Sequence, residues 1–140
     1  MTPRDIALVQ SSWKQVQPIA AQAAAMFYGR LFLLDPSVRP LFRGDLREQG
    51  TKLMSMISVA VNALSRIETL VPAVQALGRR HAGYGVEDRH YDTVEAALIW
   101  TLGEGLGEAF NAETEQAWRT AYAVLASTMK EASRAPAVPA

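Results

Sequence analysis

His81 is the side chain with the most distinctive chemistry in this sequence, which contains only two histidines. Counting backwards in helical steps leads from His81 to Leu77, Val74 and Leu70, so the imidazole lies on the apolar stripe of a short helix. Such a side chain is either a core histidine that is hydrogen-bonded to a neighbour, or a single axial ligand to a haem iron, which requires one imidazole on a helix facing an apolar pocket. Position 81 alone leaves both interpretations open.

The composition of the chain argues against several other chemistries. Its 140 residues include no cysteine, which excludes a thiolate nucleophile, a disulfide framework and an iron–sulfur site. His90 does not share a helical face with His81, so a zinc site built from histidine and cysteine is not supported. No glycine-rich phosphate loop follows a strand pattern, and nothing resembles a nucleophile elbow.

Charge and hydropathy restrict the partners of the protein. The 14 basic and 14 acidic residues give a formal net charge of zero, so no electrostatic attraction to nucleic acid or to an anionic membrane follows. No apolar run approaches the length of a membrane span, and Arg4 and Asp5 interrupt the place where a signal peptide would be apolar. We therefore expect a cytoplasmic protein that binds neither nucleic acid nor membrane.

The helices that must position His81 are visible in the C-terminal half of the sequence. Residues 70–83 form the His81 helix, with Pro72 in its first turn and glycines at its end. Glu87 and Asp88 open the next helix, in which apolar residues recur at steps of three and four. Asn111 is the expected cap of the last helix.

The N-terminal half is also predicted to be helical. Thr2 caps a first helix that has Pro3 at its first position, and Pro18 marks a bend. The following helices are expected at residues 19–34, from Asp35 to about Phe42, and from about residue 46 to residue 64. Because no stretch shows the alternation of a strand, we predict an all-α fold of about seven helices in one domain, residues 1–134, followed by a disordered Pro/Ala tail, residues 135–140.

These helices carry motifs in a specific order. The motifs are residues 27–32 (Phe-Tyr-Gly-Arg-Leu-Phe), Asp35-Pro36, Leu41-Phe42, residues 49–54 (Gln-Gly-Thr-Lys-Leu-Met), residues 77–81 (Leu-Gly-Arg-Arg-His), Gly85-Val86, Tyr91, and Ala117-Trp118 with Tyr122. On this order and spacing the chain resembles the single-domain bacterial globins, close to the globin domain of flavohaemoglobins and to neuroglobin-like proteins. The resemblance covers roughly residues 4–133. It implies the globin fold, with about seven helices packed in a three-over-three arrangement around a haem pocket.

The resemblance assigns roles to individual residues. His81 matches the proximal histidine, the ligand of the iron in haem b, and Phe42 matches the phenylalanine that packs against the haem face. On the distal side, Tyr28 and Gln49 match the polar residues that act on the bound gas, and Leu53 matches the apolar residue over the iron. The remaining cofactor-binding residues that we assign are Lys52 and Arg80, as partners of the haem propionates, together with Val86 and Tyr91.

The chemistry of the distal residues agrees with this assignment. Dioxygen on ferrous haem takes on partial negative charge, and Tyr28 and Gln49 offer an O–H and an N–H₂ donor to stabilise it. Leu53 would keep the pocket dry, which strengthens those hydrogen bonds and slows oxidation. Because Gln49 occupies the place at which neuroglobin-like proteins have a distal histidine, we expect a five-coordinate ferrous iron.

The chain departs from the flavohaemoglobin pattern behind the proximal histidine. Tyr91 matches the tyrosine found there, but the position of the accompanying glutamate falls on Ser133, with Glu131 nearby. Weak electron donation to the iron is therefore expected, and whether Glu131 replaces the glutamate stays open. The connection from Phe42 to Gln49 is also short compared with that family.

The resemblance implies a haem-b globin that binds dioxygen reversibly. Its expected partners are dioxygen, nitric oxide and other small gaseous ligands. Because the sequence given ends at Ala140 without a reductase domain, turnover of nitric oxide to nitrate is expected to need a separate reductase. Two alternatives remain at this point: a haem-based gas sensor or redox signalling module, and a haem-free helical interaction domain in which His81 is only a core residue.

Overall fold

The computed structural model describes residues 1–42 and 44–134, and the tail expected at residues 135–140 lies outside the described residues. The described chain is helical and contains no strand, which confirms the predicted all-α fold. Its α-helices are α1 (Pro3–Val16), α2 (Ala20–Leu34), α3 (Leu46–Asn62), α4 (Val71–Gly83), α5 (Asp88–Leu106) and α6 (Ala112–Arg134). Short 3-10 segments connect them: η1 (Gln17–Ile19), η2 (Pro36–Leu41), η3 (Leu64–Thr69) and η4 (Gly107–Ala109).

Local side-chain chemistry explains where these helices begin and end. The Thr2 hydroxyl accepts the Asp5 N–H at 3.1 Å while the Asp5 carboxylate accepts the Thr2 N–H at 3.0 Å, so α1 begins with a capping box. The Asn111 side chain accepts the Thr114 N–H at 2.9 Å and thereby caps α6, as the sequence predicted. At the end of α5, Gly107 has a φ of +58°, a left-handed conformation that favours glycine.

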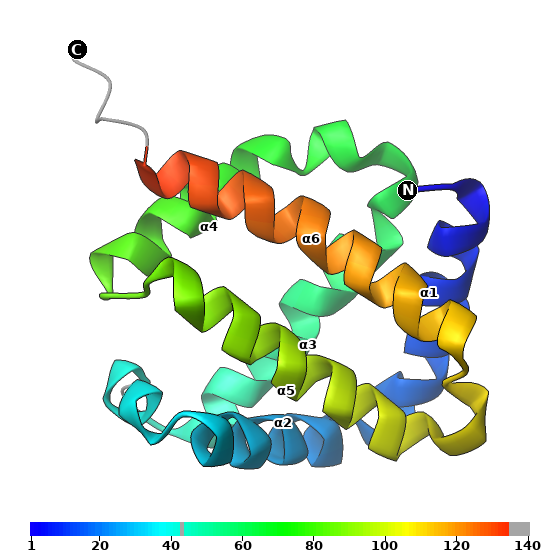
Figure 1. The fold of residues 1–140 in the computed structure, drawn as a ribbon, viewed down its shortest axis with the longest axis horizontal. Coiled ribbons are helices and arrows are strands. Elements are labelled where there is room, and N and C mark those ends of the chain that lie inside the picture. The colour runs from blue at the N-terminus through cyan, green and yellow to red at the C-terminus, as the bar shows by residue number, and fades with distance from the viewer. Residues whose placement is uncertain (43, 135–140) are drawn as a thin grey trace.

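The helices pack in two sets, α1, α4 and α6 in one and α2, α3 and α5 in the other, and α5 contacts α6 between them (Figure 1). α6 packs most extensively on α4 and also lies across α1, while α2 packs on α5 and α3. Figure 1 shows α5 and α6 side by side, with α3 behind them. The main apolar core joins α1, α3 and α6 around Trp13 and Trp118, whose ring centroids are 5.9 Å apart. A second apolar cluster on α2, η2 and α5 surrounds Tyr28.

Two glycines allow close approaches that set the positions of α3 and α4. A Cβ atom added at Gly50 of α3 would lie 2.9 Å from the Ala24 Cβ of α2. A Cβ atom at Gly78 of α4 would lie 2.4 Å from the Met129 carbonyl oxygen of α6. Because the distal candidates Gln49 and Leu53 lie on α3 and His81 lies on α4, these two contacts help to fix both halves of the expected site.

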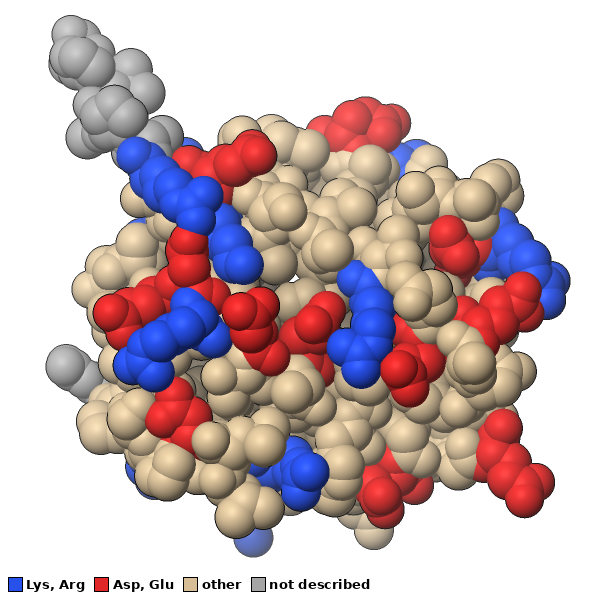
Figure 2. Space-filling view, viewed as in Figure 1, with Lys and Arg blue, Asp and Glu red and all other residues tan. Residues whose placement is uncertain are grey.

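The outer face of α5 and α6 carries charges of both signs. Figure 2 shows acidic and basic side chains interspersed over this face, without a patch of one sign. Among them, the Arg119 guanidinium lies 3.1 Å from the Glu115 carboxylate and 3.6 Å from the Glu95 carboxylate. Within the described residues, no helix combines the length and hydrophobicity needed to cross a bilayer.

Candidate haem site

The side chain of His81 is held by its own helix. Its Nδ1–H donates to the Leu77 carbonyl oxygen at 2.8 Å, one turn back along α4. In the neutral ring this leaves the lone pair on Nε2, which makes no hydrogen bond or ion pair with any described residue. The ring is partly buried, and this burial lowers the pKa of His81, with a smaller contribution from the Arg80 cation. A neutral, oriented imidazole is the form that binds a metal ion.

The loop between α4 and α5 is hydrogen-bonded to the backbone of His81 and lies close to η2. The Val86 N–H donates to the His81 carbonyl oxygen at 3.0 Å, so the assigned residue Val86 lies directly after the His81 turn. A Cβ atom at Gly85, where φ is +91°, would lie 3.7 Å from the Leu41 Cδ2 atom of η2. The ring of Tyr84 is 6.4 Å from that of His81 and its side chain is 65% exposed. We did not single out Tyr84 from the sequence, although it lies one helical step after His81.

Tyr28, assigned as the distal tyrosine, and Phe42, assigned to the haem face, are in contact. The Tyr28 and Phe42 rings meet edge to face with centroids 5.4 Å apart. Phe32 stacks on Tyr28 at 6.0 Å and also touches Phe42, and Leu53 of α3 packs against the same cluster. Tyr28 is 5% exposed, and burial raises the pKa of its hydroxyl group to about 12. The structure therefore brings Tyr28, Phe42 and Leu53 together in one cluster, and their assigned roles toward a ligand stay predictions.

The polar candidates on α3 and α4 differ in exposure. Gln49 is partly buried near the start of α3, in the first turns after the Asp45 cap, and is engaged in an interaction of its own. Lys52 and Arg80 are both exposed, and neither forms an ion pair with a described carboxylate. Exposed cations of this kind on the two helices are compatible with the expected role as propionate partners.

Tyr91 lies at the first turn of α5, with its side chain buried and its backbone carbonyl accepting the Tyr122 hydroxyl at 2.6 Å. Burial raises the pKa of the Tyr91 hydroxyl group. The ammonium group of Lys130 lies 5.4 Å from the Tyr91 ring centroid. The Ser133 hydroxyl donates to the Lys130 carbonyl oxygen at 2.7 Å, and Glu131 is exposed. A cation therefore faces the Tyr91 ring, and the side chain at the expected glutamate position bonds to its own helix.

His90, the second histidine, has a structural role that we did not assign from the sequence. It is 6% exposed, and its Nδ1 accepts the Glu87 N–H at 2.8 Å, which completes the N-terminal cap of α5. Its Nε2 lies 3.9 Å from the Glu87 carboxylate. Glu87 and His90 have the spacing of a capping box, with Glu87 at the N-cap and His90 three residues later. The residue types are unusual, because such a box normally has Ser or Thr first and Glu or Gln three residues later.

The arrangement of α3 and α4 fits a haem group. These two helices are not closely packed on each other, although α3 packs on α2 and α4 packs on α6. Apolar side chains on both helices stay partly exposed, including Leu53, Leu77 and Met56, which is 43% exposed. Partly exposed apolar side chains on both helices, and an oriented imidazole nitrogen on α4 without a described partner, are the features that a haem group between α3 and α4 would use.

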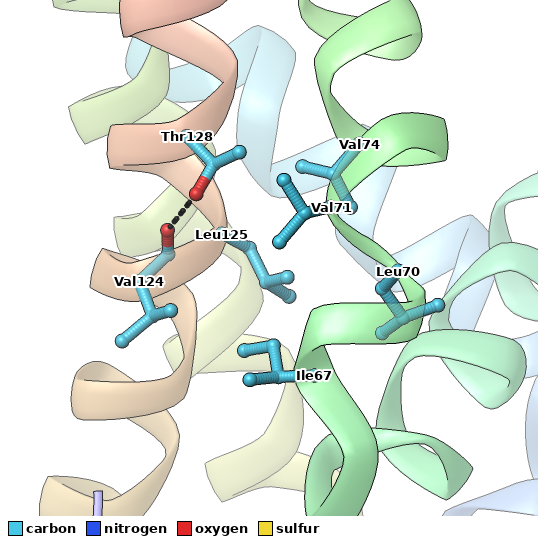
Figure 3. A pocket seen from close by; sticks show the side chains of 7 residues that line it. All are labelled: Ile67, Leu70, Val71, Val74, Val124, Leu125 and Thr128. Atoms are coloured by element: carbon cyan, nitrogen blue, oxygen red, sulfur yellow. Dashed lines mark hydrogen bonds between the residues drawn. The ribbon is translucent and has the colours of Figure 1, made fainter.

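A small apolar cavity of about 80 Å³ lies between α4 and α6. Figure 3 shows the side chains of Ile67 and Val71, from the η3–α4 segment, and of Leu125, from α6, directed into the space between the two elements. The only hydrogen bond drawn there joins the Thr128 hydroxyl to the Val124 carbonyl oxygen at 3.0 Å, so the threonine is satisfied by its own helix. The cavity is lined by Ile67, Leu70, Val71, Val74, Val124, Leu125 and Thr128.

Comparison with known proteins supports the assignment from motif order. Residues 25–129 match the Globin family. A neuroglobin of Danio rerio is 30% identical, over 92% of this chain and 90% of the relative. An anaerobic nitrite reductase of Arabidopsis thaliana is 28% identical, over 92% of this chain and 91% of the relative.

A solved structure shares the fold. It is an engineered carbene transferase, described as a putative nitric oxide dioxygenase from Rhodothermus marinus, with a TM-score of 0.85 and 26% identity over 95% of this chain and 93% of that chain. Both the sequence match over most of the chain and the common fold lead to one conclusion. The chain belongs to the globin family, and this membership implies that it binds haem.

Proposed function

We propose that this globin binds haem b between α3 and α4, binds dioxygen reversibly, and converts nitric oxide to nitrate when a separate reductase supplies electrons. The observation that carries the proposal is the state of His81: Nδ1–H donates to the Leu77 carbonyl oxygen at 2.8 Å, and Nε2 has no partner among the described residues. When bound, the haem would supply the iron at which the gases react. The protein's own contribution is to orient ligands, donate hydrogen bonds and exclude water.

The distal residues would perform the last two tasks. The Tyr28 hydroxyl makes no hydrogen bond with a described residue, so its proton is available to a ligand in the pocket. This hydroxyl group is protonated at neutral pH, and burial, which raises its pKa to about 12, extends the protonated form into the alkaline range. Gln49 would add a second donor, and Leu53 and Phe42 would keep water away from the ligand. Lys52 and Arg80 would hold the propionates at the surface.

The haem proposal is tested with two histidine variants. We expect the protein as purified to carry one haem b, and His81→Ala to lose it or to hold it weakly. His90→Asn is the matched control, because an asparagine keeps an acceptor for the Glu87 N–H and removes the other imidazole. Absorption spectroscopy of the purified proteins measures the haem content. A wild-type protein that folds without haem, or equal haem in both variants, would refute the proposal.

The nitric oxide proposal needs its own experiment. Each nitrate formed leaves the protein oxidised, so an electron must return before the next cycle. The oxygenated protein is mixed with nitric oxide, first alone, then with NADH, and then with NADH and a flavin-dependent reductase. We expect a single stoichiometric conversion without the reductase and repeated turnover with it. Absence of nitrate from the oxygenated protein contradicts the dioxygenase role, and repeated turnover with NADH alone contradicts the need for a reductase.

A further inference from the structure

A surface hollow of about 1210 Å³ lies along the junction of α2 and α3 and reaches α1. Its walls are made mainly of small side chains, and Arg47 is the only charged residue among the described residues that line it. A Cβ atom added at Gly29 would have nothing within 4 Å, so α2 borders open space at this position. The small wall residues include Ala21, Ala25 and Gly29 of α2, and Gly50, Thr51 and Ser55 of α3.

Tyr28 forms part of the lining of this hollow and also belongs to the distal cluster. Its Cε2 atom is 3.7 Å from the place where a Gly50 Cβ would lie, on the hollow side. Its ring also contacts Phe42, with Leu53 packed against the same cluster. The side chain is 5% exposed, and its hydroxyl group makes no hydrogen bond with a described residue. The Tyr28 ring therefore belongs both to the lining of the hollow and to the cluster that contains residues assigned to the distal pocket.

We propose that the hollow between α2 and α3 is the entry port for dioxygen and nitric oxide, and that the Tyr28 ring is its gate. This inference rests on the proposed function, since it names the route to the same site. Walls made mainly of small, uncharged side chains provide space with little charge, which suits small apolar gases that need no polar anchor. A larger ligand that passed Tyr28 would have to displace a ring held by Phe32 and Phe42, whereas a diatomic molecule needs only a brief rotation of it.

Filling the hollow tests the port. Ala25→Phe places a large ring in the hollow, and Gln22→Phe is the matched control, because Gln22 is exposed on the same helix and does not line the hollow. Blocking a route slows entry and exit by the same factor and leaves the affinity unchanged. We therefore expect carbon monoxide association and dissociation both to slow by about fivefold or more in Ala25→Phe, with wild-type affinity, while Gln22→Phe keeps both rates.

A second variant and a second measurement keep the test decisive. If Ala25→Phe does not fold, Gly29→Phe replaces it, with Gly29→Ala as its control.

Dissolved dioxygen should broaden the amide NMR signals of Ala21, Ala25 and Gly50 selectively, and Ala25→Phe should abolish this broadening. The NMR measurement does not depend on haem, so a protein without haem that still shows the broadening overturns the proposed function and supports gas binding in the hollow. If the protein carries haem and the filled variants keep the wild-type rates of carbon monoxide association and dissociation, the hollow is not the entry port. A changed carbon monoxide affinity also contradicts the port, because it would mean that the substitution had altered the distal pocket itself.

Discussion

Tyr28 is the residue whose burial bears most directly on the proposed function. Its ring is fixed by contacts with Phe27, Phe32 and Phe42, so the direction of its hydroxyl group is set by packing. Burial without a hydrogen-bond partner among the described residues favours the neutral phenol, which is the form that donates. The same hydroxyl group is therefore expected to act as donor over the whole physiological pH range.

Removing that donor should speed the release of dioxygen. A hydrogen bond to a charged group contributes ~1.5–3 kcal/mol, so Tyr28→Phe should raise the dissociation rate on the order of ten- to a hundredfold. Gln49→Leu should raise it as well, since both residues are assigned as donors. Stopped-flow mixing measures the rates, and Tyr84→Phe is the control because it removes an exposed hydroxyl group beside His81. Rates within about twofold of wild type in both distal variants would refute the assignment.

The alkaline titration of Tyr28 provides an independent measurement. Its pKa of about 12 in the folded protein lies above the value of 10.0 for an unburied phenol. The folded state therefore retains a proton that the unfolded state loses, and this difference lowers stability as pH rises from about 10 to about 12. We expect Tyr28→Phe to remove one late step from the absorbance titration at ~295 nm and to weaken the alkaline loss of stability. If the absorbance titration of Tyr28→Phe shows the same high-pH steps as that of wild type, the buried position of Tyr28 is contradicted.

At the scale of the helices, most boundaries follow from local chemistry and were predictable. Thr2, Pro18 and Asn111 mark helix starts or bends in the sequence, and the structure has a boundary at each of them. The 3-10 geometry of η2 and η3 was not predictable, because it depends on how the chain must cross between packed helices.

For the site, His81 was singled out by its type and helical spacing, whereas Tyr28 and Phe42 were assigned by the resemblance to the globins. The structure gives the contacts of each, and their roles toward haem and ligand stay predictions. What the sequence could not give is the tertiary arrangement, above all the exposed ring of Tyr84 beside His81 and the hollow beside Tyr28. The hollow depends on the crossing of helices that are distant in sequence, for which no local pattern exists.

The contact of α4 with α6 is the element-scale feature that bears most on His81. Gly78 precedes His81 by one helical step, and a Cβ atom there would meet the backbone of Met129. Because a backbone cannot move aside as a flexible side chain can, Gly78→Ala should push the helices apart and cost ~1–3 kcal/mol of stability. We also expect weaker haem retention, since the His81 turn would be displaced.

A glycine in open space is the control for this prediction. Gly29→Ala meets nothing within 4 Å and should raise stability by roughly 0.5–1 kcal/mol, because alanine loses less entropy in a helix. Urea denaturation measures both variants, and absorption spectroscopy measures their haem. If Gly78→Ala and Gly29→Ala have equal free energies of unfolding, the added methyl group at position 78 costs nothing. The α4–α6 contact would then be able to widen more easily than the close approach at Gly78 implies.

At the scale of the whole molecule, α6 holds the two ends of the fold together. It packs on α4, which carries His81, and on α1, which begins the chain. Within this junction the indole N–H of Trp118 donates to the Ser12 hydroxyl at 2.8 Å, and that hydroxyl donates in turn to the Leu8 carbonyl oxygen at 2.7 Å. The bond between Trp118 and Ser12 is buried and joins residues far apart in sequence, so it contributes to the tertiary fold and not to any single helix.

A double-mutant cycle isolates this bond. Ser12→Ala leaves the buried Trp118 N–H without its partner, and Trp118→Phe removes the donor and leaves a small gap, so each change should cost ~1–3 kcal/mol. In the double variant the orphaned donor is absent, and the total loss should fall short of the sum by ~0.5–1.5 kcal/mol. Urea denaturation measures the four proteins, and the haem spectrum of each folded protein should stay unchanged because neither residue belongs to the proposed haem site. Losses that add to within ~0.3 kcal/mol would show that the two side chains stabilise the fold independently, and an altered spectrum would show that the α1–α6 junction also positions α4.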